Sequence, residues 1–263
     1  MRLFWEFTQR SFQRHLTYRT AALAGLATNF FFGLLRVSVL LALFGERQEV
    51  EGFTRAGLFT YIALTQAILA YLSMFGWFDL MNSVHSGEVA NDLLKPMSFF
   101  NFWLARDLGR AAVALIFRGL TIMLLYTLFF EMVHPQSLGQ WTAVAIAVFL
   151  SWFVSFAFRF LLNLAAFWTP NALGIARFGF IFSLFFSGFL MPLAFFPVWV
   201  QRLAYLTPFP HMLNTVVDVY VGKLEGAALA EALFLQLAWV VVLVVVGQIV
   251  LGAAVKRLVI LGG

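Results

Sequence analysis

Six long apolar runs dominate this chain of 263 residues. A helix that crosses the hydrocarbon core of a bilayer needs about 20 mostly apolar residues. Because backbone groups find no water partner in lipid, each run is expected to be a helix, and the short alternating segments of a transmembrane barrel do not appear in the sequence. The six transmembrane helices predicted in this way cover about residues 22–44, 57–80, 107–130, 141–168, 173–193 and 229–253.

The composition excludes a soluble domain. Hydrophobic residues make up 62% of the chain and charged residues 11%, whereas charged residues average about 25% in soluble domains. The net charge of +5 comes from Arg and Lys that flank the apolar runs, with no basic run to suit nucleic acid. The absence of cysteine excludes disulfides and Cys-ligated metal sites. We expect one all-α polytopic membrane domain over residues 1–263.

The first 20 residues carry too many charges to form the apolar core of a cleavable signal peptide. Drawn as a helix, residues 1–20 separate an apolar side from a charged side. This pattern predicts a helix that lies in the inner membrane interface before the first span, with an ordinary solvated leader as the alternative. The apolar side holds Met1, Trp5, Phe12 and Leu16, and the charged side holds Glu6, Arg10 and Arg14.

Lys and Arg are distributed unequally between the two sides of the membrane. If the N-terminus lies inside, ten of the 17 basic residues lie on the inner side, four on the outer side and three within spans. The positive-inside rule then puts both termini in the cytoplasm. The inner residues are Arg2, Arg10, Arg14, Arg19, Lys95, Arg106, Arg110, Arg177, Lys256 and Arg257, and the outer ones are Arg47, Arg55, Arg202 and Lys223.

A polar island, residues 86–96, separates the second and third apolar runs and falls on the inner side. It is expected to be a short helix, with Ser86 as N-cap and Glu88 near the positive end of the helix dipole. Leu93 and Leu94 are apolar residues available to a soluble partner, and a plain connector is the alternative. The other positions that matter here are Gly87, Val89, Asn91, Asp92, Lys95 and the helix-ending Pro96.

The segment between the last two runs, residues 194–228, is too apolar for a solvated loop and too rich in proline for another span. We expect short helices that re-enter the outer leaflet, with the prolines setting the bends.

Three arginines lie within predicted spans, where a central Arg costs at least about 2.5–3.5 kcal/mol. Asp79, near the end of the second run, is predicted to pair with Arg159. Arg36 and Arg118 have no evident acid and should face the bundle interior or a wet cavity, where they meet an anionic substrate group or backbone carbonyls. Alternatively they snorkel, or they bind amides, for which the candidates are Asn29, Gln66 and Asn163.

Catalytic and metal chemistry find little support. The four histidines show no spacing with Asp or Glu that suits a metal site. Ser187 falls in the fifth run without a histidine at that depth to act as its base.

Several motifs, in their order along the chain, resemble those of the ABC-2-type transporter permeases of bacteria. The inner motif is Gly87, Val89 and Leu93 to Pro96; the outer motif runs from Met191 to Trp199. Pro208 to Pro210, Tyr220 and Gly222 follow, and the chain ends in a basic, Gly-Gly terminus from Arg257 to Gly263.

The resemblance implies a permease subunit of an ATP-driven exporter in the bacterial cytoplasmic (inner) membrane. It pairs with a second permease, identical or not, among membrane lipids, and separate ATPase subunits bind ATP and Mg. Consistent with this, the chain lacks a Gly-x-x-x-x-Gly-Lys-Ser/Thr phosphate loop. Residues 86–96 would form the helix that couples to the ATPase. The translocation path would be lined by Arg36, Arg118, Arg159 and Asp79. The outer gate would comprise Pro192, Phe196, Pro197, Trp199, Pro208 and Phe209.

Two other classes of protein remain as alternatives. An ion-coupled secondary transporter needs acidic residues deep in the spans, whereas the deep charges expected here are arginines. A membrane-embedded lipid-modifying enzyme needs a catalytic cluster at the interface, and the sequence supplies none.

The ten-to-four distribution of basic residues predicts the topology directly. Reporter fusions at Gly263 and in the 131–140 loop should report the cytoplasmic and the outer side, respectively, because the inner flanks carry most of the positive charge. Alkaline phosphatase and green fluorescent protein fusions measure this. The reverse signal at either position would contradict the orientation.

Overall fold

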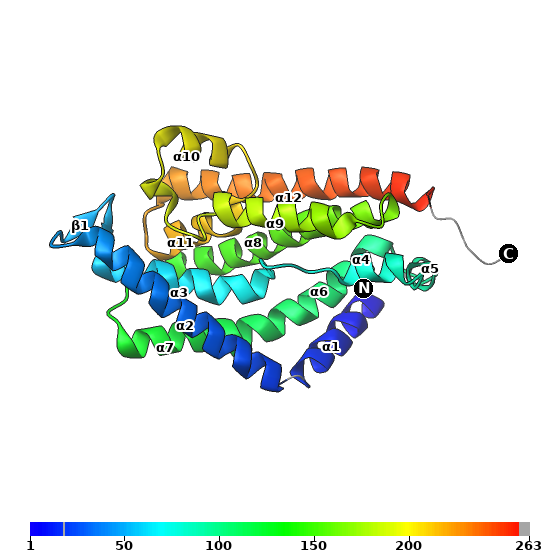
Figure 1. The fold of residues 1–263 in the computed structure, drawn as a ribbon, viewed down its shortest axis with the longest axis horizontal. Helices are drawn as coiled ribbons and strands as arrows, with labels where there is room; N and C mark the ends of the chain where they lie inside the picture. Colours follow the sequence, from blue (N-terminus) through cyan, green and yellow to red (C-terminus); the bar gives the residue numbers. More distant parts are fainter. Residues whose placement is uncertain (18, 258–263) are drawn as a thin grey trace.

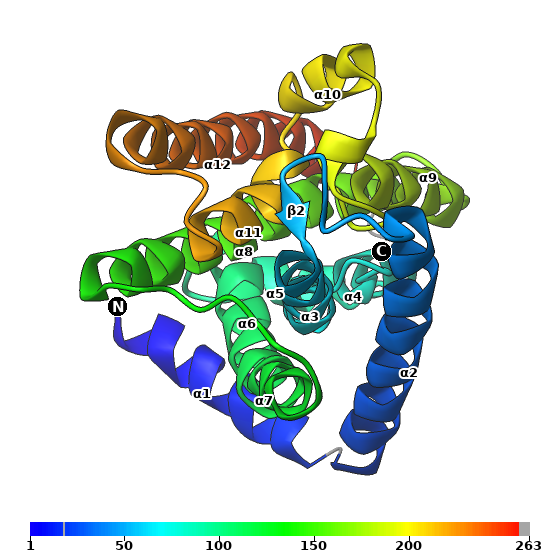
Figure 2. The same ribbon diagram turned by 90° about the vertical axis from the view of Figure 1, so that its left-hand side faces the viewer.

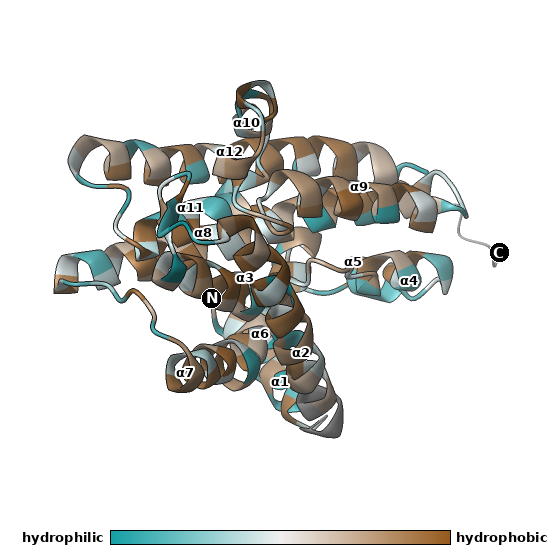
Figure 3. Cartoon of the chain, turned by 60° about the vertical axis from the view of Figure 1, so that its left-hand side comes forward, coloured by the Kyte–Doolittle hydropathy of each residue, from teal (hydrophilic) through white to brown (hydrophobic). Residues whose placement is uncertain are grey.

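The computed structural model describes residues 1–17 and 19–257, and five of its helices are long and apolar enough to cross a membrane. They lie roughly along the long axis of the molecule (Figure 1), and apolar residues cover most of their length (Figure 3). These five helical segments are α2 (Arg19–Phe44, apolar from Ala24), α3 (Arg55–Leu72), Phe99–Phe129, Leu138–Phe167 and α12 (Gly226–Val255). Five of the six predicted spans are therefore confirmed as long apolar helices.

The second span is shorter than predicted. α3 ends at Leu72 because Ser73 adopts the left-handed conformation, with φ 53°, and its N–H bonds to the carbonyl of Ala70 at 3.3 Å. A separate short helix, α4 (Asp79–His85), follows after a non-helical stretch. The expectation of one helix over residues 57–80 is wrong, and Asp79 belongs to α4.

The fifth predicted span is the one that falls short of membrane length. α9 covers Ala172–Phe186, and 15 residues extend about 22 Å, less than the roughly 30 Å of a bilayer core. The chain then turns at Gly188, where φ is 81°, a conformation that residues other than glycine rarely adopt. The predicted range 173–193 is wrong beyond Phe186, since residues 187–192 are not helical.

The third span begins eight residues before the predicted position. Ser98 caps it by accepting a hydrogen bond from the Asn101 N–H at 3.3 Å. The helix continues through α6 (Phe99–Ala114), a π-helical segment η1 (Leu115–Gly119) and α7 (Leu120–Phe129). The fourth span consists of α8 (Leu138–Leu164) and the 3-10 turn η2 (Ala165–Phe167).

The N-terminal helix, α1 (Arg2–Leu16), packs along α6 (Figure 2). The approach is closest at Gly109, where an added Cβ would lie 2.3 Å from the carbonyl oxygen of Thr8. Phe7 packs edge-on against Phe102 at a centroid distance of 5.1 Å. The predicted helix is present, but one side of it is bound to the bundle, while Trp5 remains 62% exposed.

The end of the molecule opposite α4 and α5 (Val89–Leu93) carries a hairpin and the short helices between α9 and α12 (Figure 1). We call residues 187–225 the outer segment, after the side of the membrane predicted for most of them. A small hairpin of β1 (Glu49–Val50) and β2 (Phe53–Thr54) departs from the all-α expectation. The predicted short outer helices are present, and α11 packs against α8. These elements are η3 (Leu193–Phe195), α10 (Val198–Tyr205), η4 (Pro210–Met212) and α11 (Asn214–Tyr220).

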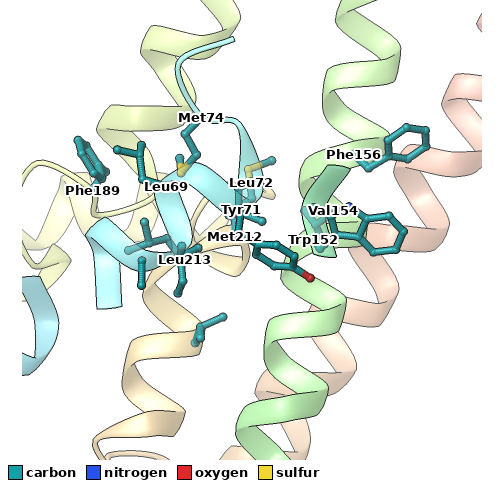
Figure 4. Close-up of a cluster of buried hydrophobic side chains, with 14 of the residues drawn as sticks. Leu69, Tyr71, Leu72, Met74, Trp152, Val154, Phe156, Phe189, Met212 and Leu213 are labelled. Carbon is teal, nitrogen blue, oxygen red and sulfur yellow. The ribbon is translucent and has the colours of Figure 1, made fainter. Parts of the chain in front are cut away.

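The main apolar core forms where α3, α8 and α11 meet (Figure 4). Leu72 and Leu213 are fully buried, and so are Phe156 and Val217. Burying a side chain of this size contributes about 1.5–3 kcal/mol relative to water, but lipid is itself apolar, so close packing rather than water exclusion holds the lipid-embedded part of this core together.

The α1–α6 contact predicts that Gly109→Ala destabilises the protein. The new methyl group meets backbone atoms of α1, which cannot move aside cheaply, so we expect a loss of about 1–3 kcal/mol. Gly252→Ala in α12 is the control, since its Cβ would meet nothing within 4 Å. Thermal unfolding in detergent measures both variants, and equal midpoints would contradict the close packing.

Candidate functional site

The inner island, residues 86–96, contains one short helix and two turns. α5 covers only Val89–Leu93, and Ser86 is the C-cap of α4. Gly87, with φ 79°, separates the two helices. The expectation that Ser86 caps a helix ending at Pro96 is wrong, because Glu88 is the N-cap, without a side-chain hydrogen bond, and α5 ends before Leu94.

Contacts within the chain hold the island in place. Val89 is fully buried. Asp92 is buried as well, accepts a hydrogen bond from the Ser83 hydroxyl at 2.8 Å and forms an ion pair with Lys95. The Lys95 Nζ atom also lies 3.8 Å from the centroid of the Phe102 ring. The island is therefore a folded part of the bundle and not a free connector.

The two leucines of the island differ in exposure. Leu93 is half-buried and packs against the main core, whereas Leu94 is 83% exposed. Leu94 thus offers most of its apolar surface to a partner and Leu93 only part of it, and docking by either residue stays a prediction. Asn91, Glu88 and Pro96 are exposed beside Leu94.

A buried ion cluster joins α6 to α8. Both carboxylate oxygens of Asp107 accept from the Arg159 guanidinium, at 3.0 and 2.8 Å. Arg110 Nε donates to the same carboxylate at 2.7 Å, and Trp152 Nε1 donates to it at 2.8 Å. Asp107 and Arg159 are at most 1% exposed. Two guanidinium groups thus compensate a carboxylate that is fully withdrawn from solvent.

The same cluster satisfies the carbonyl groups at the broken end of α3. Arg110 Nη2 donates to the Tyr71 carbonyl at 3.0 Å, and the Ser155 hydroxyl donates to that of Leu72 at 3.1 Å. The last carbonyls of a helix have no partner within the helix, so these bonds stabilise the break.

Asn163, one turn beyond Arg159, connects α8 to the segment that leads into the island. Its amide nitrogen donates to the Trp77 carbonyl at 2.8 Å, and its amide oxygen accepts from the Met81 N–H at 3.0 Å. The expectation that Asn163 satisfies Arg36 or Arg118 is therefore wrong.

The predicted pair of Asp79 and Arg159 is also wrong. The Asp79 side chain is 52% exposed, and its nearest basic group is Arg106, at 3.9 Å. Sequence reasoning missed Asp107, which stands at the first position of the predicted third run. The spacing of Asp107 and Arg110, three residues apart on one helix face, was the signal that could have identified it.

Arg36 binds the backbone just after α9, at the start of the outer segment. Its guanidinium donates to the Phe189 carbonyl and to the Thr65 hydroxyl, the latter at 2.9 Å, and lies 4.6 Å from the Phe189 ring centroid. It borders an apolar cavity of about 510 Å³ that Asn29 and Gln66 also line. Among the described residues, neither amide is hydrogen-bonded to Arg36. Of the partners predicted for Arg36, the structure contains the backbone carbonyls.

The other two arginines have different neighbours. Arg118, within η1, lies against α2, where a Cβ added to Gly25 would approach its Nη2 atom to 2.7 Å. Arg159 lies in the ion cluster. The predicted path residues Arg36, Arg118, Arg159 and Asp79 thus do not converge on one site.

The six predicted gate residues divide between a buried and an exposed part of the outer segment. Pro192 and Pro208 are buried. Phe196 packs on Phe185 and Phe209 on Phe158, both at 5.1 Å between ring centroids. In contrast, Pro197 and Trp199 are exposed at the start of α10.

Hydrogen bonds connect the exposed and buried parts of the outer segment. The Asn214 amide donates to the Tyr205 hydroxyl at 3.1 Å and to the Asp218 carboxylate at 2.6 Å. Burial raises the pKa of Asp218 to about 6, although the nearby Lys223 and the Asn214 hydrogen bond act in the opposite direction. The outer segment therefore contains a carboxyl group whose pKa lies above its usual range.

Comparison with known proteins identifies one family. The family described as ABC-2 family transporter protein matches residues 29–262. No curated protein matches the chain. The basic terminus from Arg257 to Gly263 lies almost wholly outside the described residues.

The ion cluster predicts that Asp107→Asn strongly destabilises the protein. Asparagine keeps the shape but leaves the buried Arg159 and the partly buried Arg110 without their counter-charge, and breaking a buried pair in this way costs about 3–5 kcal/mol. Asp79→Asn is the matched control, since its pair with Arg106 is long and exposed and contributes at most about 1 kcal/mol. Thermal unfolding in detergent measures both. An Asp107→Asn midpoint equal to that of Asp79→Asn would contradict the role assigned to the cluster.

Proposed function

The chain belongs to the ABC-2 transporter family and is a multi-pass membrane component of a transporter, and from this premise we propose that it is the permease subunit of an ATP-driven exporter. A second permease, the same chain or a sibling, completes the translocation path. Separate ATPase subunits bind ATP and Mg and supply the energy. Membership of the family rests on the family match; the exporter direction and the subunit arrangement are our proposal.

The observation that carries the proposal is the exposure of Leu94 on a folded loop. An apolar side chain that is 83% exposed gains nothing in water. The buried Val89 and the Asp92–Lys95 ion pair hold the loop beneath it. A fixed apolar side chain flanked by polar groups suits insertion into a groove of a partner. We assign that partner as the ATPase subunit, with residues 86–96 as the coupling element.

The contacts behind the island support transmission of force into the spans. α5 packs against α4 and α6, and α4 packs against α8. The side chain of Asn163, on α8, bonds to backbone groups of Trp77, before α4, and of Met81, within α4. The ion cluster then joins α8 to α6. A displacement of the island would thus move several helices together.

We assign the outer segment as the gate of the translocation path. α10 is exposed and attached by few polar contacts, among them the Asn214–Tyr205 hydrogen bond, whereas α11 is buried against α8. Arg36 joins α2 to the first residues of the segment. We propose that movement of α2 and α8 in alternating access releases α10, with Trp199 and Phe196 at its leading edge.

The proposed location is the cytoplasmic membrane of a bacterium, with both termini in the cytoplasm. The distribution of basic residues supports this orientation. The island and α1 lie at the end of the bundle opposite α10 and α11 (Figure 1), as a cytoplasmic ATPase and an outer gate require. We also propose that α9 and the residues after it complete a sixth crossing. The apolar cavity beside Arg36 favours an amphipathic substrate.

One observation favours the ion-coupled alternative. Asp218 is a partly buried carboxyl group, and desolvation raises its pKa to about 6, which suits a group that exchanges a proton. It lies outside the long apolar helices, however, while Asp107, within one of them, is occupied by Arg110 and Arg159. A coupling ion needs a free carboxylate at membrane depth, and we therefore favour ATP as the source of energy.

Leu94→Asp should detach the ATPase. The substitution puts an uncompensated charge into the proposed groove, and a docking residue of this kind contributes about 2 kcal/mol or more, equivalent to a roughly 30-fold loss of affinity. Leu206→Asp is the control, because Leu206, in the outer segment, is 75% exposed. Co-purification with the ATPase in detergent measures binding, and equal recovery with both variants would refute the coupling role. Leu93 is unsuitable for this test because it packs in the core.

Transport should require the ATPase and ATP. Liposomes that contain the permease alone, with a proton or sodium gradient, should accumulate no substrate. The chain has no phosphate loop, and of the two carboxylates in its described long helices, Asp107 is paired with Arg110 and Arg159 while Glu231 stands in the second turn of α12, near the helix end. Uptake driven by a gradient alone would replace this proposal by the ion-coupled alternative, and loss of uptake in Asp218→Asn would then identify the coupling group.

A further inference from the structure

A second cavity, of about 330 Å³, lies where α1 crosses the beginning of α6, next to the α4–α5 segment. Arg10 and Arg14, one helical turn apart on α1, contribute to its wall, and Arg106 does so from α6. The aromatic rings of Phe7 and Phe102 form the apolar part. The cavity thus combines several guanidinium groups with an aromatic surface.

The charges around this cavity are incompletely compensated. Asp107 is already occupied by Arg110 and Arg159. Within residues 1–17 and 19–257, neither Arg10 nor Arg14 forms an ion pair. Asp79 and Glu88 also border the cavity, but both are exposed, and the closest approach of Asp79 is 3.9 Å, to Arg106. The unpaired arginines of α1 are therefore available to an anion.

The position of α1 puts this cavity at the surface of one leaflet. α1 ends at Leu16 and α2 begins at Arg19, and the apolar span within α2 begins at Ala24. α1 must therefore lie at the boundary where the first span enters the membrane. It also exposes Leu3 and Trp5, and Trp is typical of the membrane–water interface. A lipid headgroup in the adjoining leaflet lies at the same depth.

We propose that this cavity binds a phosphate group, and that its source is the headgroup of an anionic phospholipid. Two planar guanidinium groups on successive turns match the oxygens of a phosphate. The partly exposed ring of Phe7, held against the buried Phe102, contacts the glycerol portion. Such a lipid would bridge α1 to α6 and fix the start of the bundle to the membrane surface. The proposal does not depend on the exporter function.

The test measures lipid retention by the purified full-length chain. Native mass spectrometry counts phosphatidylglycerol and phosphatidylcholine bound at equal concentration, and a parallel thermal-shift series uses inorganic phosphate. The variant is Arg10→Gln with Arg14→Gln. The matched control is Arg2→Gln with Arg47→Gln, which removes two exposed charges away from the cavity.

We expect the wild type and the control to retain phosphatidylglycerol over phosphatidylcholine, and the cavity variant to lose about tenfold of that preference. If inorganic phosphate stabilises the wild type as strongly as phosphatidylglycerol does, and the cavity variant loses this effect, that result would support the phosphate site, with a free anion as its source. Equal retention of both lipids by the wild type, which needs no variant, would overturn the proposal. So would an unchanged lipid preference in the cavity variant, since the arginines would then not bind the headgroup.

Discussion

The ion cluster around Asp107 is the interaction on which the rest of the bundle depends. A carboxylate withdrawn from water costs several kcal/mol unless opposite charges and hydrogen bonds replace its solvation, and here Arg159, Arg110 and Trp152 replace it completely enough to bury it. The same two arginines join three helices, because Arg110 also reaches the carbonyl groups at the end of α3. Without these donors, the break at Leu72 would leave carbonyl groups unsatisfied at membrane depth, where such groups are costly.

Polar links of this kind matter more in a membrane protein than in a soluble one. Apolar helix faces gain little by leaving lipid for one another, so close packing and hydrogen bonds decide which helices associate. Both devices occur here. Gly109 brings α1 against α6, and Gly33 makes room for Tyr126 of α7 beside α2. Arg36 of α2 binds the Phe189 carbonyl after α9, and Asn163 of α8 binds the Trp77 carbonyl between α3 and α4.

The sequence was sufficient for the family, the number of apolar runs and the position of the polar island, since all three rest on composition and residue order. The helix ends were predicted less well. Nothing in the run that contains Leu72 and Ser73 indicates a break, because the partners that stabilise it, Arg110 and Ser155, come from other helices. Asp107 was missed for the same reason: a carboxylate at the edge of an apolar run is normally solvated, and its burial depends on Arg159, 52 residues later. The exposure of Leu94 but not Leu93 depends likewise on tertiary packing.

The π-helical segment of the third span, Leu115–Gly119, has a consequence for how this span contacts its neighbours. One π turn accommodates an additional residue, which advances the angular phase of everything after it by about 100°. α6 contacts α1, α3 and α8, whereas α7 contacts α2 and α3. A regular 3.6-residue period through this segment would offer a single stripe to all four partners. The extra residue thus rotates the contact face of α7 relative to that of α6 within one continuous helical segment, and it sets the direction in which Arg118 projects.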